Sequence, residues 1–424
     1  MGPIKIIGLC LLAVLVAGAS WFYRPWSDYS PARVIEARDT LDRVPYYRTM
    51  AEYFPHNTIA ASPKAYALER DLFPTALVYS YDGETRDLDD YAARRDITGL
   101  IVVRDEKVII ERYWRGADVD DHHTSWSVAK SFVATLVGIA LKEGAIEDLT
   151  DPVVKYAPIY RDTDYGQTTI QHLLMMSSGI DFSENYEETG SDIRDLFFNT
   201  FFLNQDLDKV VRGYDRNRDP GQDFDYVSTN TAVLGAALSG AYGGRSLSDL
   251  AAEKVFAPLG MQAGTWLTDR NSRSGKELAY CCLNIRLEDY AKFGLLYLNQ
   301  GMAGETRILP EGWANFVSTV PNEATHSPGA TDPSRPVGYG HHFWIPKEQD
   351  GSFFAAGYNG QFVFINPNTN TVVAITGADQ TYPGQQEVWA LLRAASEVGA
   401  PVNADASDNA DRMTNGPLKD GEAN

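Results

Sequence analysis

One apolar stretch constrains the fold of this chain more than any other: Ser125–Leu141, which reads SWSVAKSFVATLVGIAL. Within this stretch, Lys130 carries the only formal charge. A helix that is apolar on every face belongs in the interior of a protein. We therefore predict a buried helix here, capped by Thr124 or Ser125 and ended by Gly144.

Two side chains of this helix, Ser127 and Lys130, could react as a pair. Ser127 is expected in the first turn, with Lys130 one turn later on the same side. A serine hydroxyl becomes a good nucleophile when a neighbouring base takes its proton. Lysine can be that base if burial lowers its pKa from about 10.4 toward neutrality. The pair is a candidate nucleophile and base; the alternative is an ordinary serine and a lysine whose amine reaches solvent.

Composition places the chain among globular proteins and excludes some partners. Hydrophobic residues make up 44% and charged residues 22% of 424 residues, enough for a large core and two or three folding units. The net charge of −20 argues against nucleic acid or an anionic membrane surface as a partner. The sequence has no glycine-rich phosphate loop, no His-Glu-x-x-His and no Cys-x-x-Cys. We expect neither a cofactor nor a metal.

The first residues read as a targeting segment. Lys5 precedes an uninterrupted apolar run, Ile6–Ala19, which ends in the small residues Ala17-Gly18-Ala19. This pattern predicts a signal for export. The run continues to Tyr23 without a charge, so residues 1–23 could instead remain as an uncleaved membrane anchor of about the minimum spanning length.

The cysteines bear on the compartment. Cys281 and Cys282 are adjacent, and a disulfide between neighbours would be strained, so we expect two buried thiols. An exported protein without an evident disulfide fits the bacterial periplasm, either free or held at the inner membrane by the N-terminal segment.

The remaining chain divides by pattern into three regions. Residues 24–96 are polar and rich in proline, which predicts an extended arm on the main body. Residues 97–399 alternate between strand and helix patterns, with a mostly helical insert at about 146–336. Residues 400–424 form an acidic tail that is expected to be disordered. We predict an α+β fold: one antiparallel sheet from both ends of the body, helices on it, and a cleft beside the insert.

The elements that support this division are as follows. Strands are expected over Thr98–Val103, Val108–Trp114, Phe343–Pro346, Ser352–Ala356, Gln361–Asn366 and Thr371–Thr376. Further helices are expected over Ile170–Met176, Thr231–Gly240, Leu247–Phe256, Leu287–Leu298, after Pro310 and over Gln385–Glu397.

Two more segments are candidates for the cleft. The segment 220–230 reads PGQDFDYVSTN, a polar turn that leads into an apolar helix. Tyr226 in it could carry a proton; the alternative is that Ser228 or Thr229 only caps the helix. The segment 356–361 reads AGYNGQ, and its glycines would let a substrate approach the backbone before an apolar strand. The alternative there is a simple β-turn.

Taken together, these segments resemble the motifs of the penicillin-recognising serine hydrolases, which carry Ser-x-x-Lys, then Tyr-x-Asn, then Lys-Thr-Gly, or variants, in this order. Within that superfamily the chain is most similar to the 6-aminohexanoate-dimer hydrolase and esterase branch, related to class C β-lactamases. The resemblance runs from about Ile97 to Gly399 and implies the β-lactamase/transpeptidase-like fold. Its matching stretches are 125–131, 172–179, 258–261 and 283–294.

Residue roles follow from this resemblance by position. It makes Ser127 the acylated nucleophile, Lys130 its general base and Tyr226 the second proton carrier. The backbone N–H groups of Ser127 and Gln361 would form the oxyanion hole, where one donor is worth about 10²–10³ in rate. Residues implied in substrate binding are Tyr186, Ser228, Asn284, Tyr358, Asn359 and Gly360.

The chain departs from the family pattern in two places. Ser228 and Asn230 also satisfy a Ser-x-Asn pattern, which would move the second proton carrier from Tyr226 to Ser228; the preceding Pro-Gly-x-x-Phe-x-Tyr favours Tyr226. Tyr358 stands where lysine helps to hold the substrate carboxylate, and a phenol supplies no charge-assisted hydrogen bond of that strength. A neutral ester or amide is therefore favoured over a β-lactam.

The sequence thus predicts a serine hydrolase that cleaves a small ester or amide through an acyl-enzyme. Within the enzyme class, the alternative is a β-lactamase or D-Ala-D-Ala peptidase. From another class, the alternative is a penicillin-binding sensor or binding module without turnover. The membrane is a partner only through residues 1–23.

Overall fold

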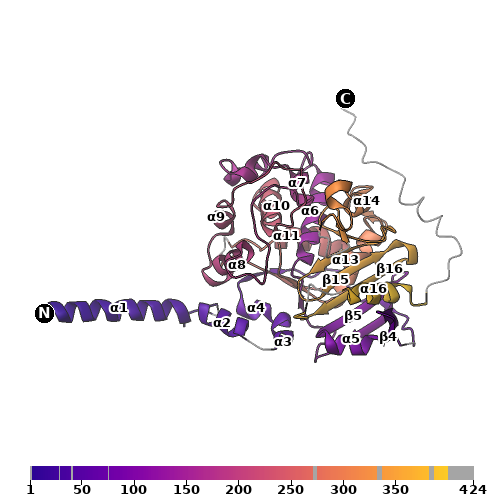
Figure 1. Ribbon diagram of the computed structural model, residues 1–424, viewed down its shortest axis with the longest axis horizontal. Helices are drawn as coiled ribbons and strands as arrows, with labels where there is room; N and C mark the ends of the chain where they lie inside the picture. Colours follow the sequence, from indigo (N-terminus) through magenta and orange to yellow (C-terminus); the bar gives the residue numbers. More distant parts are fainter. Residues whose placement is uncertain are drawn as a thin grey trace.

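An eight-stranded sheet forms the framework of the computed structural model (Figure 1). The structure describes residues 2–399 except 28, 40–41, 75, 271–274, 332–336 and 382–385, so the predicted acidic tail lies outside the described residues. The strand order is β12–β13–β14–β15–β16–β5–β6–β2. These strands are β2 (Glu69–Arg70), β5 (Ile97–Arg104), β6 (Lys107–Tyr113), β12 (Val337–Tyr339), β13 (Trp344–Pro346), β14 (Phe353–Gly357), β15 (Gln361–Asn366) and β16 (Thr371–Gly377).

The sheet joins the two ends of the main body, as predicted. β5 pairs antiparallel with β16, with Val102 opposite Val373, and β5 also pairs antiparallel with β6. β14, β15 and β16 follow as antiparallel neighbours, and only β2 and β6 pair in parallel among the strands of this sheet. The fold is α+β, and the predicted strands and hairpins are confirmed to within about one residue.

Helices cover both faces of this sheet. The residues of β5 alternate: Ile101 and Val103 belong to one buried cluster, Leu100 and Val102 to the other. The first cluster contains α6 (Val128–Glu143) and α13 (Leu287–Leu298), and the second contains α5 (Leu88–Arg94) and α16 (Glu387–Glu397). A strand that is buried on both sides is apolar throughout, which explains the continuous run of β5 rather than an alternating one.

The predicted helical insert is present, with a small sheet that the sequence analysis missed. Its helices include α7 (Ile170–Leu174), α8 (Asp192–Phe197), the π-helix η4 (Phe198–Phe202), α9 (Leu207–Val211), α10 (Ser228–Ala241), α11 (Leu247–Ala251), the π-helix η5 (Ala252–Phe256), α12 (Ala257–Leu259) and α14 (Trp313–Ser318). The small sheet has the order β1–β8–β9–β7, formed by His56–Ile59, Gly264–Leu267, Leu283–Ile285 and His123–Thr124.

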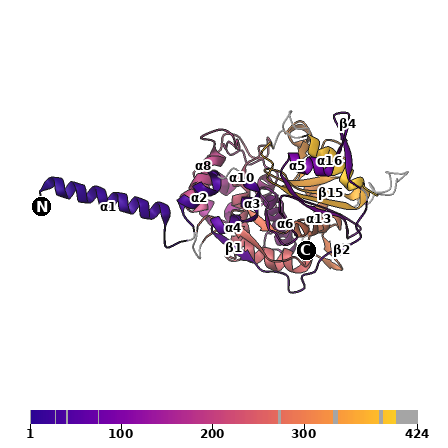
Figure 2. The same ribbon diagram turned by 90° about the horizontal axis from the view of Figure 1, so that it is seen from below.

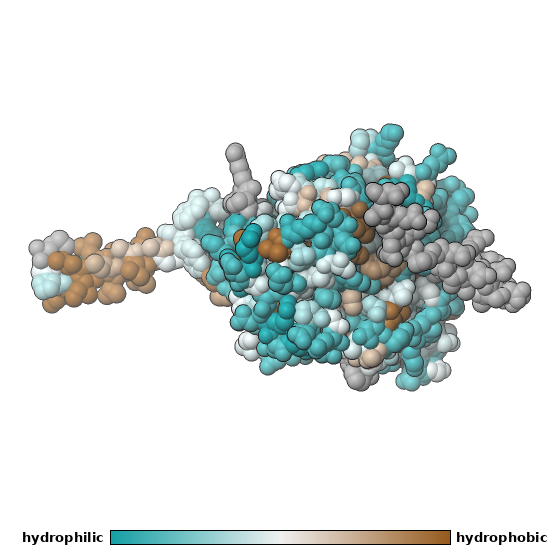
Figure 3. Space-filling model, turned by 90° about the horizontal axis from the view of Figure 1, so that it is seen from above, coloured by the Kyte–Doolittle hydropathy of each residue, from teal (hydrophilic) through white to brown (hydrophobic). Residues whose placement is uncertain are grey.

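The N-terminal region is more structured than an extended arm. It forms α2 (Pro31–Asp39), α3 (Arg43–Arg48) and α4 (Met50–Tyr53), and it contributes β1 to the small sheet and β2 to the large one. Before it, α1 (Pro3–Tyr23) projects from the body with no buried residue (Figures 1 and 2). Figure 3 shows the apolar surface of this helix against a largely hydrophilic body. Among the described residues, α1 is long and apolar enough to cross a membrane.

The start of α6 differs from the prediction. The helix begins at Val128 with Ser127 as its N-cap residue, rather than with a cap at Thr124 or Ser125. Thr124 pairs with Asn284 in the small sheet, and the Ser125 N–H donates to the Leu283 carbonyl at 2.7 Å. These pairings hold both residues in an extended segment, so the helix cannot start there. Gly144 ends the helix as predicted, in the left-handed conformation.

The close packing of α6 gives a test of the fold. A Cβ atom added to Gly138 would lie 2.5 Å from Cε2 of Trp313, whose side chain is fully buried at the start of α14. Gly138→Ala is therefore expected to lower the free energy of unfolding by about 1–3 kcal/mol through overpacking. Urea denaturation followed by tryptophan fluorescence measures this change. An unchanged midpoint would show that α6 and α14 are not packed this closely.

Candidate active site

The hydroxyl of Ser127 is positioned by the turn that precedes α6. Ser125 is fixed on β9 from both sides, because its N–H donates to the Leu283 carbonyl at 2.7 Å and its Oγ accepts from the Leu283 N–H at 3.0 Å. Trp126 follows with a φ of 42°, a left-handed conformation that costs energy for a side chain of this size. This strained turn puts Ser127 at the N-terminus of α6, where the helix dipole favours negative charge on oxygen.

The amine of Lys130 lies at the centre of the site. Its Nζ donates to Ser127 Oγ at 3.0 Å, to Ser228 Oγ at 3.1 Å and to the Tyr280 carbonyl at 2.9 Å. Lys130 is 2% exposed. Burial lowers its pKa to about 8, although the nearby Glu184 carboxylate opposes the shift. A substantial fraction of this lysine is therefore neutral at mildly alkaline pH and can accept a proton from Ser127.

A carboxylate that the sequence analysis missed completes this network. Glu184 accepts from Ser228 Oγ at 2.5 Å, from the Ser228 N–H at 2.9 Å and from the Tyr186 hydroxyl at 2.7 Å. A chain of hydrogen bonds therefore runs from Ser127 through Lys130 and Ser228 to Glu184 and Tyr186. The available signal was weak: Glu184 lies two positions before Tyr186 in a loop of several acidic residues.

Both candidates for the second proton carrier adjoin the amine, in different ways. Ser228, the first residue of α10, bonds directly to Lys130, whereas the ring centroid of Tyr226 lies 5.0 Å from Nζ. The Tyr226 ring stacks on Trp344 with centroids 5.4 Å apart. Ser228 thus contacts the Lys130 amine through a hydrogen bond. The ring of Tyr226 packs against the same amine.

The turn between β14 and β15 lies against the segment that carries Ser127. At Gly357 a Cβ atom would collide with the Ser125 carbonyl, so only glycine allows this approach. Asn359 and Gly360 both have positive φ, 61° and 93°, which forms the tight turn. The Gln361 side chain donates to the carbonyls of the turn and of β16, and its backbone begins β15. The predicted oxyanion pair, Ser127 and Gln361, stays a prediction.

The other predicted binding residues have different surroundings. Tyr358 stacks on Tyr186 with ring centroids 4.8 Å apart, and both line one cavity. The Asn359 amide donates to the Tyr47 hydroxyl at 2.6 Å, which ties the turn to α3. Asn284 is buried in β9 and donates to the Cys282 carbonyl and to Thr265. The Asn284 amide therefore forms hydrogen bonds within and beside the small sheet. The structure does not place it among the groups that contact Lys130.

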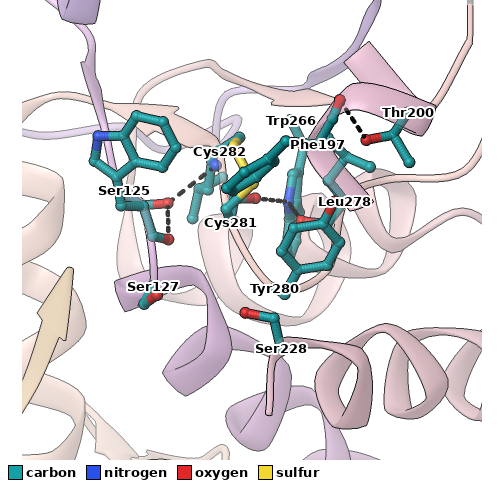
Figure 4. The surroundings of a disulfide bond; sticks show 12 residues. Ser125, Ser127, Phe197, Thr200, Ser228, Trp266, Leu278, Tyr280, Cys281 and Cys282 are labelled. Atoms are coloured by element: carbon teal, nitrogen blue, oxygen red, sulfur yellow. Dashed lines mark hydrogen bonds between the residues drawn. A yellow bond between two sulfur atoms is a disulfide. The ribbon is translucent and has the colours of Figure 1, made fainter. Parts of the chain in front are cut away.

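The cysteine prediction is wrong: Cys281 and Cys282 form a disulfide (Figure 4). The two residues lie in a tight turn in which Cys282 has a φ of 67°, and this left-handed conformation lets neighbouring sulfurs meet. The turn is anchored by Trp266, whose indole N–H donates to the Cys281 carbonyl at 2.9 Å and to the Leu278 carbonyl at 3.1 Å. It directly follows Tyr280, whose carbonyl accepts from Lys130.

Comparison with known proteins assigns this arrangement to a family. A model of the beta-lactamase family matches residues 85–397. The chain belongs to the beta-lactamase family. It is 27% identical over 335 residues to the 6-aminohexanoate-dimer hydrolase of Paenarthrobacter ureafaciens, covering 75% of this chain and 84% of that protein. This beta-lactamase-family chain is accordingly an enzyme of the serine hydrolase superfamily.

Solved structures show the same fold. A Bacillus anthracis protein proposed to be a 6-aminohexanoate-dimer hydrolase has a TM-score of 0.75 at 21% identity, covering 85% of this chain and 95% of its own. EstCE1, a hydrolase with promiscuous acyltransferase activity, has a TM-score of 0.56 at 17% identity, covering 73% and 96%. A family VIII carboxylesterase has a TM-score of 0.55 at 17% identity, covering 72% and 94%. The β-lactamase/transpeptidase-like fold is therefore confirmed.

The charge of Glu184 gives a test of the base. If neutral Lys130 is required, kcat/KM for an ester rises with pH to a plateau, with an apparent pKa near 8. Glu184→Gln is expected to move this rise to lower pH, because the carboxylate holds the pKa of Lys130 up. Glu187→Gln, an exposed neighbour in the same loop, is the matched control and should leave the profile in place. If kcat/KM of Glu184→Gln rises at the same pH as that of the unmodified enzyme, the ionisation of Lys130 does not cause the rise.

Proposed function

We propose that this enzyme hydrolyses a neutral ester or amide through an acyl-enzyme on Ser127. One observation carries the proposal: a buried amine, whose pKa burial lowers to about 8, lies 3.0 Å from a hydroxyl at a helix N-terminus. This arrangement supplies a nucleophile, its base and a favourable field for the developing alkoxide. The 6-aminohexanoate-dimer hydrolase and esterase names among the similar proteins agree with cleavage of an amide or an ester.

The proposed reaction has two halves. Neutral Lys130 takes the proton of Ser127 as its Oγ forms a bond to the carbonyl carbon, and the carbonyl oxygen becomes an oxyanion. The N–H groups of Ser127 and Gln361 are proposed to stabilise this oxyanion. As the intermediate collapses, the bond to the alcohol or amine breaks, and that group leaves with a proton from Tyr226, which the Lys130 ammonium replaces. Water then attacks the acyl-enzyme and gives one proton to neutral Lys130, which passes it to Ser127 as the bond to the acyl group breaks and the acid is released.

Tyr226 is proposed to bring the proton to the leaving group. Ser228 makes the direct contact with Lys130, but its own proton points to Glu184 at a distance of 2.5 Å. A hydroxyl that donates to a carboxylate has no second proton for a leaving group. We therefore assign Ser228 and Glu184 to holding the amine and Tyr226 to proton transfer.

The β-lactamase or D-Ala-D-Ala peptidase alternative would need a cation for the substrate carboxylate. Tyr358 supplies none, because burial raises its pKa and the phenol stays neutral; Arg43 and Arg194 line the same cavity as Tyr358. Nitrocefin turnover or labelling by fluorescent penicillin would favour this alternative. A single burst of acylation without steady turnover would favour a sensor or binding module instead. For location, we propose that α1 directs export or anchors the enzyme in the inner membrane.

The nucleophile is tested by removing its hydroxyl. Ser127→Ala is expected to lower p-nitrophenyl ester hydrolysis by a factor on the order of 10⁴ or more and to abolish fluorophosphonate labelling, since no covalent intermediate can form. Ser80→Ala, at an exposed position of a distant strand, should keep both. Activity that persists in Ser127→Ala, measured by initial rates on purified protein, would refute the mechanism.

The second proton carrier is tested by two conservative variants. Tyr226→Phe should lower kcat by about 10²–10⁴, the usual contribution of a positioned proton donor, with little effect on labelling of Ser127 by a reagent that carries a good leaving group. Ser228→Ala should lower kcat less and should change the pH profile, because it removes a contact to Lys130. The reverse ranking of the two kcat values would move the role to Ser228.

A further inference from the structure

A cavity of about 620 Å³ lies at the end of the body from which α1 projects. Its walls come from two parts of the chain: α2, α3 and α4 of the N-terminal region, and α8 with η4 of the insert. Figure 2 shows α2 and α8 next to each other at this end, and residues of α2 contact η4. The volume falls in the range of sites for small organic ligands.

The lining of this cavity reaches the residue next to Ser127. Trp126, which directly precedes Ser127, lines it, and the Trp126 ring meets the rings of Tyr47 at 5.4 Å and Tyr358 at 6.2 Å, both edge-on. Tyr186 lines it as well, and the hydroxyl of Tyr186 donates to Glu184 in the active-site network. The residue that positions the nucleophile thus supplies one wall of the cavity.

The interior of the cavity is largely aromatic, and the half-buried Arg43 is the one charged lining residue that is not exposed. The rings of Phe197 and Phe201 are parallel, with centroids 5.4 Å apart, and Phe54 meets Phe201 at 4.6 Å. Arg194 and Asp195, which also line the cavity, are exposed. Such a lining favours apolar groups, because burying a polar group without a partner costs free energy.

We propose that this cavity binds an apolar alkyl chain of the substrate, so that the enzyme prefers esters or amides with a medium-length chain. The inference rests on the proposed function at Ser127 and adds the substrate class. A chain attached next to the scissile carbonyl extends past Trp126 into the space between Phe197 and the N-terminal helices. Each methylene that enters an apolar site contributes about fourfold in kcat/KM.

Two substrate series measure this preference. The first is p-nitrophenyl acetate, butyrate, hexanoate and octanoate; the second is a set of acetate esters of alcohols of the same lengths. In at least one series kcat/KM should rise by about fourfold per methylene until the cavity is full. The two series also distinguish a chain on the acyl side from one on the leaving-group side.

Variants of residues that line the cavity test whether the preference for longer chains arises there. Thr189 lines the cavity and is exposed, so Thr189→Trp should fill it without disturbing the core and should abolish the rise while acetate hydrolysis persists. Glu188→Trp, at an exposed position outside the lining, is the matched control. A second pair avoids reliance on one variant: Phe198→Asp, at a half-exposed lining residue, should flatten the rise, and Phe198→Leu should keep it.

The outcomes separate this inference from the proposed function. Hydrolysis that depends on Ser127 but is flat across both series would overturn the chain-binding cavity and leave the acyl-enzyme mechanism standing. A rise with chain length that survives both Thr189→Trp and Phe198→Asp would place the chain elsewhere and would also overturn the inference. Hydrolysis that persists in Ser127→Ala would defeat the proposed function itself.

Discussion

The site depends on one buried amine, that of Lys130, which is excluded from water and is uncharged for part of the time. Burial of Lys130 raises the free energy of its ammonium form, and three hydrogen bonds satisfy its donors so that the folded state tolerates the group. Two of these acceptors are held in place by further interactions. Ser228 bonds to Glu184, and the Tyr280 carbonyl directly precedes the disulfide turn. The negative charge of Glu184 limits how far the pKa of Lys130 falls. Burial and the nearby carboxylate thus have opposite effects on this pKa.

What the sequence could predict was local in character. The buried helix, the pairing of Ser127 with Lys130 one turn apart, and the strands around Pro367 follow from periodicity within a few residues. Glu184 could not be found in this way, because its contact with Ser228 joins residues 44 positions apart. The disulfide was mispredicted because a general rule on adjacent cysteines ignores the left-handed backbone that Cys282 adopts in its anchored turn.

The N-terminal region shows a different limit. Its polar and proline-rich composition predicts an extended arm, yet Tyr47, Met50 and Phe54 are buried in the main core. Short helices such as α3 and α4 have little stability alone and form because a tertiary surface buries one of their faces. The surface that does so includes η4, β7, β8 and the β14–β15 turn, which are distant in sequence, so no local pattern could reveal the packing.

Under the proposed function, this division also separates the residues of the reaction from those that select the substrate. The groups around Lys130 belong to the region that the family model matches, residues 85–397, whereas more than a third of the residues that line the aromatic cavity come before it. The Asn359–Tyr47 hydrogen bond and the Trp126–Tyr47 ring contact join the two parts beside the nucleophile. Under the proposed mechanism, a change in the N-terminal helices can therefore alter which group lies next to Ser127 without altering the amine of Lys130. Family membership then specifies the reaction more closely than it specifies the substrate.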